Sequence, residues 1–279
     1  GHRLENVEVL FRQAPKGSRG QHFGGRIVFD RAGFVYLTLG DRGEMQRAQR
    51  PDDHAGSVIR LHDDGRVPKD NPFVGRSGWK PEKFTIGNRN MQGAALHPQT
   101  GVLWTHEHGP QGGDEINVMR PGVNYGWPVI TYGVDYSGDR IGEGSAREGM
   151  EPPVYYWDPV IAPSGMAFYT GDRYPGWKGH VFIGSLSGSL VKLTLQNGRV
   201  TKEERHTHID CQKRADGDKR HLGAVQPREH PRELGTVLGA ARDCCDPPEH
   251  EARATLHRVG LGALGKKEDY VARQLHRWH

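Results

Sequence analysis

Residues 25–39 read GRIVFDRAGFVYLTL and contain two short runs rich in β-branched and aromatic side chains, at residues 25–29 and 34–39. The turn between the runs contains Asp30 and Gly33. Valine, isoleucine, phenylalanine and tyrosine favour strands, and a short turn that holds Asp and Gly commonly joins two such strands. The stretch therefore predicts an antiparallel β-hairpin.

The same pattern of strand, turn and strand occurs twice more along the chain. The starting points Arg26, Gly93 and Met166 are separated by 67 and 73 residues. Hairpins that recur at a nearly constant spacing are typical of a β-propeller, an all-β fold of 4 to 8 blades. Because three hairpins occupy most of the chain, we expect an all-β propeller whose ring is incomplete. The two further hairpins are predicted at residues 93–97 with 102–105 and at residues 164–169 with 180–184.

The strand pattern divides the chain into two parts. Beyond residue 204 it stops, and residues 205–279 contain eight of the 16 histidines but only two aromatic residues. We predict a partial propeller of about three to four blades over residues 1–204 and a tail over residues 205–279 that is poorly ordered or out of frame. Short apolar runs predict further strands at residues 7–11, 116–119 and 190–195.

The composition supports a turn-rich protein and argues against several functions. Glycine contributes 39 of the 279 residues without a collagen-like period. No apolar run approaches the roughly 20 residues needed to cross a bilayer, so no transmembrane segment is expected. The net charge of +4 is not gathered into a basic stripe with aromatic residues, which argues against nucleic acid as a partner. The three cysteines predict neither a disulfide framework nor a metal-binding pair.

A glycine-rich stretch at residues 106–127, HEHGPQGGDEINVMRPGVNYGW, is a candidate ligand site. Its glycines allow backbone carbonyl groups to approach a ligand closely. The adjacent carboxylates Asp114 and Glu115 are hard oxygen ligands, which suit calcium better than a transition metal. An ordinary solvated surface loop is the alternative interpretation.

His22 and Arg89 occupy equivalent positions, each just before the first strand of a predicted hairpin. A neutral imidazole is a natural general base near pH 7, and an arginine between two asparagines offers rigid donors to a carbonyl or carboxylate. Taken alone, either residue fits an ordinary surface position. In a propeller the hairpin entrances face one side of the central channel, so we expect these two to converge. The Gly109–Pro110 loop and the turn at residues 162–164 are expected at the same place.

Three further motifs are treated as chance matches. A GxGxxG pattern at residues 260–265 has no strand before it. The sequence His106-Glu107-His108 has neither the spacing nor the helical context of the HExxH zinc motif. Residues 206–211 contain potential metal ligands but no second ligand cluster accompanies them.

Five stretches in this order resemble the soluble aldose sugar dehydrogenases of the glucose/sorbosone dehydrogenase family. The resemblance covers about residues 5–204. It implies a six-bladed β-propeller of the quinoprotein glucose dehydrogenase type that uses pyrroloquinoline quinone (PQQ) and Ca²⁺. It also implies that an aldose is oxidised at C1 to a lactone, that hydride passes to PQQ and that an external acceptor takes the electrons. The stretches are QHFGGRIVFDRAGFVYLTLGDRGEMQ (21–46), GRVPKDNPF (65–73), TIGNRNMQGAALHP (85–98), EHGPQGGDEINVMRPGVNYGWP (107–128) and APSGMAFYTG (162–171).

The resemblance also implies roles for individual residues. His22 matches the catalytic base that takes the proton of the anomeric hydroxyl, and Arg89 matches a catalytic arginine that donates to the quinone carbonyl. Asp41 and Gln46 match positions near the sugar or the base. The implied cofactor-binding residues are Arg89, Asn90, Ala162, Pro163, Ser164, Ser185, Leu186 and Ser187. The implied calcium ligands are the carbonyl groups of Gly109 and Pro110 at the PQQ-bound ion, with Glu115 and Tyr125 at a second, structural ion.

Some features depart from the family pattern. Ser187 stands where a lysine that contacts the cofactor is common, and no arginine-bearing strand of a last blade follows Glu204. The chain begins with Gly1 rather than Met. We therefore expect a truncated and inactive chain whose full-length parent is the enzyme. The resemblance alone implies that this parent is periplasmic or secreted, and a homodimer of the parent is a further expectation.

Two other functions fit the same residues. A calcium-dependent propeller lactonase also uses a central calcium ion and a histidine base, but it would place several carboxylate and asparagine side chains on one axial ion. A non-catalytic propeller that binds partners would not need Arg89 and Asn90. Titration with PQQ and Ca²⁺ separates these alternatives from a dehydrogenase.

Overall fold

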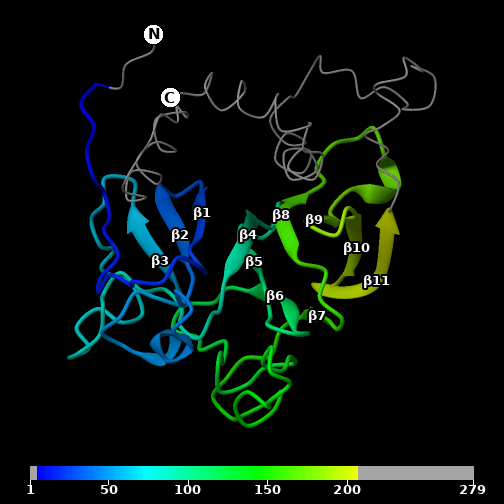
Figure 1. The fold of residues 1–279 in the computed structure, drawn as a ribbon. Helices are drawn as coiled ribbons and strands as arrows, with labels where there is room; N and C mark the ends of the chain where they lie inside the picture. The colour runs from blue at the N-terminus through cyan, green and yellow to red at the C-terminus, as the bar shows by residue number, and fades with distance from the viewer. Residues whose placement is uncertain (1–4, 207–279) are drawn as a thin grey trace, which may run out of the picture.

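Each predicted hairpin forms the first two strands of an antiparallel sheet (Figure 1). The computed structural model describes residues 5–206, and strands that follow one another in the chain pair within each sheet. The first sheet contains β1 (Gly24–Phe29), β2 (Phe34–Leu39) and β3 (Ser57–His62). The second contains β4 (Met91–Leu96), β5 (Leu103–Glu107), β6 (Asp114–Val118) and β7 (Tyr155–Trp157). The third contains β8 (Pro163–Phe168), β9 (Val181–Ser185), β10 (Leu190–Gln196) and β11 (Arg199–His206).

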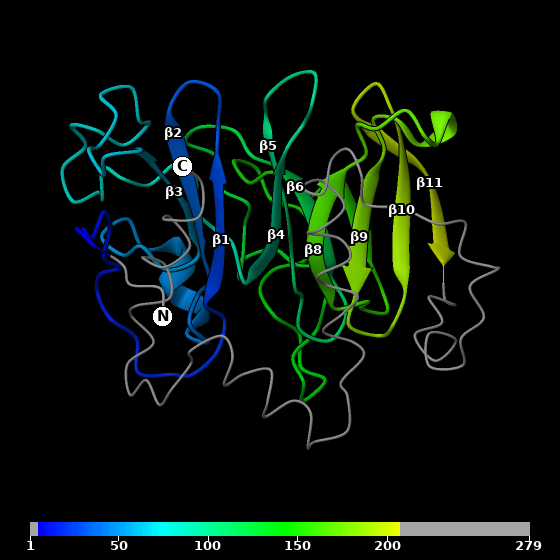
Figure 2. The ribbon, with the colours of Figure 1, turned by 90° about the horizontal axis from the view of Figure 1, so that it is seen from above.

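The first strand of each sheet lies next to the first strand of the following sheet. Strand β1 contacts β4, and β4 contacts β8. Figure 2 shows the three sheets side by side in an open arrangement. Sheets that meet along their first strands and fan outward are blades of a propeller. The prediction of an all-β, incomplete propeller is therefore confirmed.

Two short 3₁₀ helices complete the secondary structure of residues 5–206. Helix η1 (Met45–Gln49) follows β2, and η2 (Pro175–Trp177) lies between β8 and β9. Within these described residues, neither helix has the length or hydropathy needed to span a bilayer.

Strands β3 and β7 are among the strands that the sequence pattern did not predict. Strand β3 is almost entirely buried, and the charged Arg60 within it interrupts the apolar run. The guanidinium of Arg60 lies 3.7 Å from the centre of the Phe34 ring and pairs with Asp70, which explains how the strand accommodates the charge. Strand β7 has only three residues, which is too short for a periodic signal.

The predicted strand at residues 7–11 is wrong. The segment forms no strand and belongs to none of the three sheets of the described residues. Its Phe11 ring instead packs edge-on against His54, with 5.0 Å between the ring centres. Val7 and Val9 are about half exposed, so of this alternation Phe11 packs against the fold while the two valines do not. The strand predicted at residues 116–119 is observed as β6, which begins earlier, at Asp114.

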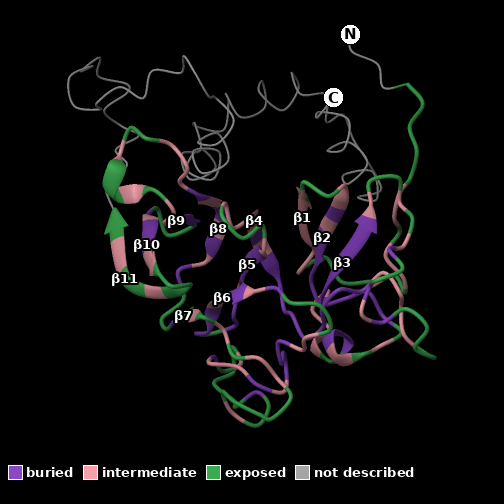
Figure 3. Ribbon diagram, turned by 180° about the vertical axis from the view of Figure 1, so that it is seen from behind, coloured by how far each residue is buried: buried purple, intermediate pink, exposed green. Residues whose placement is uncertain are grey.

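The hydrophobic core lies mainly between the sheets. The junction of the second and third sheets is filled by aromatic and aliphatic side chains, and Trp104 meets Phe168 edge-to-face at 5.7 Å. The junction of the first and second sheets buries Val58, Met91 and Leu103. Figure 3 shows buried residues concentrated in β3, β5 and β9, whereas β1 and β11 are mostly intermediate or exposed.

Strand β11 continues to His206. Residues 1–4 and 207–279 are outside the described residues. The GxGxxG pattern at 260–265, most of the 206–211 stretch and almost all of the predicted tail lie there. The division of the chain at residue 204 stays a prediction.

We expect Leu193→Ala to lower the free energy of unfolding by about 2–5 kcal/mol, because it leaves a cavity in the core between the second and third sheets. Val74 is 41% exposed, so Val74→Ala should change the same quantity by less than about 0.5 kcal/mol. Urea unfolding followed by tryptophan fluorescence measures both variants. Equal midpoints for the two would contradict this core.

Candidate functional site

His22 lies at the entrance to β1 in an unusual backbone conformation. Its φ of 52° is in the left-handed region, which residues other than glycine rarely adopt. Gly40 makes room for it, because a Cβ atom at that position would lie 2.1 Å from the His22 carbonyl oxygen and 3.2 Å from that of Arg89. Such backbone strain is often found at functional sites. The fold thus holds His22 close to the entrance of the second sheet.

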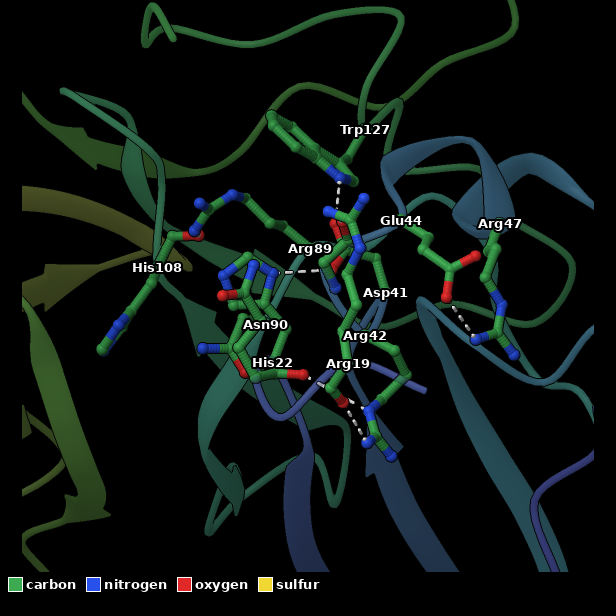
Figure 4. Close-up of polar contacts among 12 residues, drawn as sticks. Arg19, His22, Asp41, Arg42, Glu44, Arg47, Arg89, Asn90, His108 and Trp127 are labelled. Carbon is green, nitrogen blue, oxygen red and sulfur yellow. Dashed lines mark hydrogen bonds and ion pairs between the residues drawn. The ribbon is translucent and has the colours of Figure 1, made fainter. Parts of the chain in front are cut away.

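Asp41 fixes the orientation of the His22 ring. One carboxylate oxygen lies 2.6 Å from His22 Nδ1, and the other accepts a hydrogen bond of 2.8 Å from the indole nitrogen of Trp127. Figure 4 shows both side chains reaching Asp41, which is only 1% exposed. A carboxylate accepts but cannot donate, so Nδ1 carries the proton and the lone pair of neutral His22 is on Nε2. This geometry suits a general base that acts through Nε2.

Arg89 connects the entrance of β4 to the glycine-rich loop. Its guanidinium donates to the carbonyl groups of His108 and Gly109 at 3.0 and 2.8 Å, and it lies 5.2 Å from the centre of the Trp127 ring. The neighbouring Asn90 accepts a hydrogen bond from the backbone of Gly24 through its side-chain oxygen. The entrances of β1 and β4 and the loop therefore lie together.

Asp114 and His108 bring the entrance of β8 to the same place. One oxygen of Asp114 accepts the backbone N–H groups of Ile161 and Ala162, both at 2.7 Å, and the other accepts that of Gly109 at 2.8 Å. His108 Nε2 donates to the Pro163 carbonyl at 2.7 Å. Burial raises the pKa of Asp114, while these N–H groups oppose the rise. The structure therefore joins the entrances of all three sheets.

The turn after β9 completes this group. The backbone N–H of Leu186 donates to the Ala162 carbonyl at 3.0 Å, and the hydroxyl of Ser185 lies 2.5 Å from that of Ser187. Ala162 has a φ of 49°, so it shares the left-handed conformation of His22 at the equivalent entrance. The Leu186 side chain is 56% exposed. An exposed apolar side chain here can cover a flat ligand.

Comparison with known proteins identifies the family. Residues 1–216 match the family model described as Glucose / Sorbosone dehydrogenase. This chain belongs to the glucose/sorbosone dehydrogenase family.

Several relatives support this assignment. The chain is 45% identical over 206 residues to the aldose sugar dehydrogenase YliI of Escherichia coli strain K12, which covers 73% of this chain and 56% of that protein. A crystal structure of glucose dehydrogenase matches with a TM-score of 0.71 at 49% identity, over 73% of this chain and 60% of that one. The PQQ-bound form of an aldose sugar dehydrogenase from Streptomyces coelicolor matches with a TM-score of 0.53 at 28% identity, over 67% and 49%. The chain spans about half the length of the curated relatives it matches.

Glu107 belongs to the site of this family member, although the sequence did not indicate it. Its carboxylate accepts the backbone N–H groups of Arg89 and Asn90 and the side-chain amides of Asn88 and Asn117. Burial raises the pKa of Glu107 to about 7, and the hydrogen bonds from Asn88, Arg89 and Asn90 together with the charge of Arg89 oppose that rise. The sequence signal that indicates it is a glutamate at the end of the second hairpin strand, opposite the Asn88-Arg89-Asn90 turn.

The remaining predicted residues have other surroundings. Glu115 accepts a hydrogen bond of 2.9 Å from Asn117, and burial together with the nearby Glu107 raises its pKa well above the ordinary value. The Tyr125 ring lies in the core between the first two sheets, and its hydroxyl donates to the Val118 carbonyl. Gln46 is exposed on η1. Residues 5–206 contain no cluster of three or more His, Cys, Asp or Glu side chains able to hold a metal ion.

Two buried side-chain atoms of residues predicted to contact the cofactor have no hydrogen-bond partner in residues 5–206. They are Nε of Arg89 and Oγ of Ser164. A buried polar atom without a partner is costly, and a bound ligand can provide the missing partner. Both residues were predicted to contact the cofactor, and their chemistry fits a ligand rich in carbonyl and carboxylate oxygens.

We expect Glu107→Gln to lower the free energy of unfolding by about 1–3 kcal/mol, because the new NH₂ group faces donors instead of accepting from them. The matched control is Glu151→Gln in the exposed pair with Arg120, which should cost no more than about 1 kcal/mol. Thermal unfolding followed by circular dichroism measures both. A loss at Glu107 no larger than that at Glu151 would disprove its role in holding the Arg89 turn.

His106 provides a pH dependence of stability. The ring is fully buried against Gly93 and Gly165, and burial lowers its pKa to about 3. In the unfolded chain the ordinary pKa is about 6.5. The stabilisation is therefore present above about pH 6.5 and is lost as the pH falls, by about 2 kcal/mol between pH 7 and pH 5. We expect His106→Asn to reduce this part of the pH dependence, as measured by urea unfolding at both pH values. His62→Asn is the control, and an unchanged slope in His106→Asn would contradict the expectation.

Proposed function

We propose that this family member works as a PQQ- and Ca²⁺-dependent aldose sugar dehydrogenase that oxidises aldoses at C1 to lactones. The observation that carries the proposal is the pairing of His22 with Asp41 beside the partly unpartnered guanidinium of Arg89. A base with its lone pair on Nε2 and a cation beside it suit the removal of a hydroxyl proton while negative charge develops on an acceptor. The names of the E. coli and S. coelicolor relatives support sugar oxidation and PQQ.

The residues at the three entrances fit PQQ, an anionic quinone. Arg89 and Asn90 would hold the quinone carbonyl end, and Ser164 would give its buried hydroxyl to another oxygen. Ala162, Pro163 and the turn at residues 185–187 would line the opposite side, with the exposed Leu186 against the flat ring. When bound, PQQ supplies the two-electron oxidation of the sugar carbon, and calcium makes its carbonyl more electrophilic.

The proton is handled by residues of this chain. His22 Nε2 takes the proton of the anomeric hydroxyl, and the resulting imidazolium is stabilised by Asp41 at 2.6 Å. Trp127 keeps the second oxygen of Asp41 occupied and so prevents the carboxylate from turning away. A positioned base of this kind contributes typically 10²–10⁴-fold to the rate.

We assign calcium to the carbonyl groups of Gly109 and Pro110. Carbonyl oxygens are suitable calcium ligands, and a carbonyl has two lone pairs, so Gly109 is able to bind an ion while it accepts from Arg89. Glu115 and Tyr125 are proposed for a second, structural ion, with Tyr125 acting through its backbone oxygen because its hydroxyl is already bonded to Val118. Asp41 and Gln46 are proposed near the sugar. We further propose an external electron acceptor, a periplasmic or secreted location and a homodimer.

Titration of the protein with PQQ and Ca²⁺, followed by absorbance, tests the proposal against the alternatives. A dehydrogenase gives a saturable spectral change that depends on both additions. A propeller lactonase or a non-catalytic module gives none. Absence of any change would refute the proposal.

In the whole protein, we expect His22→Gln to lower kcat with an aldose and a dye acceptor by about 10²–10⁴-fold while the PQQ titration is retained, because the base is lost but the cofactor contacts remain. His62→Gln is the matched control. The pairing of Gly24 with Leu39 and of Phe34 with His62 places His62 at the opposite end of the first sheet. Equal rates for the two variants would exclude His22 as the base.

A further inference from the structure

His22 lies in a segment that belongs to none of the three sheets of the described residues. Residues 15–23, which we call the strap, contain no strand and lead into β1 at Gly24. Backbone carbonyl groups outside a sheet need other donors. The carbonyl of Pro15 accepts a hydrogen bond of 2.7 Å from the guanidinium of Arg47, which lies on η1. Side chains that follow β2 thus take the place of strand pairing along the strap.

Arg42 contacts the strap on both sides of His22. Its Nη2 donates to the Arg19 carbonyl at 2.8 Å, and its Nε donates to the Gln21 carbonyl at 3.3 Å. The guanidinium carbon lies 4.0 Å from the centre of the Phe23 ring, a cation–π contact. The backbone N–H of Arg42 also donates to the His22 carbonyl at 3.3 Å. Figure 4 shows the Arg42 side chain reaching the backbone of Arg19 beside His22.

The strap returns one of these contacts to the turn that carries Asp41. Arg19 Nη1 donates to the Gly43 carbonyl at 2.7 Å, so Arg19 and Arg42 form a reciprocal pair of guanidinium–carbonyl bonds. The backbone N–H of Gly43 donates at 2.7 Å to the same Asp41 oxygen that lies 2.6 Å from His22 Nδ1. The two arginines therefore tie the segment that presents His22 to the turn that presents its carboxylate partner.

This connection matters because a general base acts only at hydrogen-bond distance. A shift of about 1 Å can lower a rate by about 10²-fold. Asp41 restrains the His22 ring but does not hold the main chain that carries it. A guanidinium is a rigid planar fork that reaches two carbonyl groups at once, whereas an ammonium group is a point charge on a flexible stem. An arginine at position 42 is therefore better suited than a lysine to fix the main chain beside His22.

We propose that Arg42 is a positioning residue for the general base of the site. Arg42 holds the main chain on both sides of His22, so that Asp41 meets Nδ1 and the lone pair on Nε2 faces the substrate. This inference rests on the proposed dehydrogenase function, because the placement of His22 matters to catalysis only if His22 is the base. An arginine that merely covers the surface of the strap would affect neither the ring nor the rate.

The first measurement is the tautomer of His22, followed by ¹H–¹⁵N NMR of the 279-residue chain with labelled histidine at alkaline pH, where neutral histidine prevails. The signals that disappear in His22→Gln identify the residue. We expect the proton on Nδ1 in the wild type. In Arg42→Gln we expect a mixture of both tautomers, because a ring released from Asp41 can carry its proton on either nitrogen.

The second measurement is the rate of the whole protein with an aldose and a dye acceptor. Arg42→Gln should lower kcat by about 10²-fold while KM and the PQQ titration stay close to the wild type. Arg42→Lys keeps the charge but holds fewer carbonyl groups, so its kcat and its tautomer ratio should lie between the two. Arg66→Gln is the matched control, since Arg66 pairs with the exposed Asp64 beside His62 and should match the wild type in both measurements.

A wild-type tautomer in Arg42→Gln would overturn the positioning role, whatever the rate. Circular dichroism shows whether this variant folds, and if it does not, a wild-type tautomer in Arg42→Lys would overturn the role in the same way. The two measurements also separate this inference from the function on which it rests. A mixed tautomer without any fall in kcat keeps the contact between Arg42 and the strap but excludes His22 as the base, and the proposed function fails with it.

Discussion

Buried carboxylates hold the strand entrances of the three sheets together. Each entrance leaves backbone N–H groups that no neighbouring strand accepts, and a buried N–H without a partner is costly. Glu107 accepts two of them at the entrance of β4, and Asp114 accepts two before β8 and one from Gly109. Asp41 orients His22 in a comparable way. Asp114 on β6 reaches across to the third sheet, whereas Glu107 on β5 anchors the entrance of β4 within its own sheet, so the same contacts that fix the blades also position the candidate site.

The charge of these carboxylates is balanced by dipoles more than by cations. Glu107 has four donors, of which none is an ammonium or a guanidinium, and Asp114 has three backbone donors. Burial nevertheless raises the pKa of both groups, which shows that desolvation is only partly offset. The guanidinium of Arg89 therefore keeps donor capacity for a ligand. It is not consumed by an ion pair with a neighbouring carboxylate among the described residues.

The fold was largely predictable because each blade begins with a hairpin whose apolar runs are short, regular and separated by clear turns. Strand β3 was not predicted because Arg60 interrupts its apolar run. Strand β7 was not predicted because three residues are too few to show a period. The convergence of His22 and Arg89 followed from their equivalent positions before two inner strands. The part played by His108 did not, since its partner Pro163 belongs to the next sheet. Glu107 lies opposite Met91 in the predicted hairpin, but the predicted second strand ended at Thr105 and so did not include it. A residue's neighbours across a sheet junction are not encoded in local spacing.

The Glu107 carboxylate accepts hydrogen bonds from the backbone N–H groups of residues 89 and 90 and not from their side chains. The contact with Glu107 therefore survives a change of side chain at residues 89 and 90, whereas the contacts of Arg89 with Gly109 and of Asn90 with Gly24 depend on those side chains. This division lets a substitution alter what the turn recognises while the backbone of the turn stays anchored. A strand entrance built in this way allows new ligand specificities to arise by single substitutions.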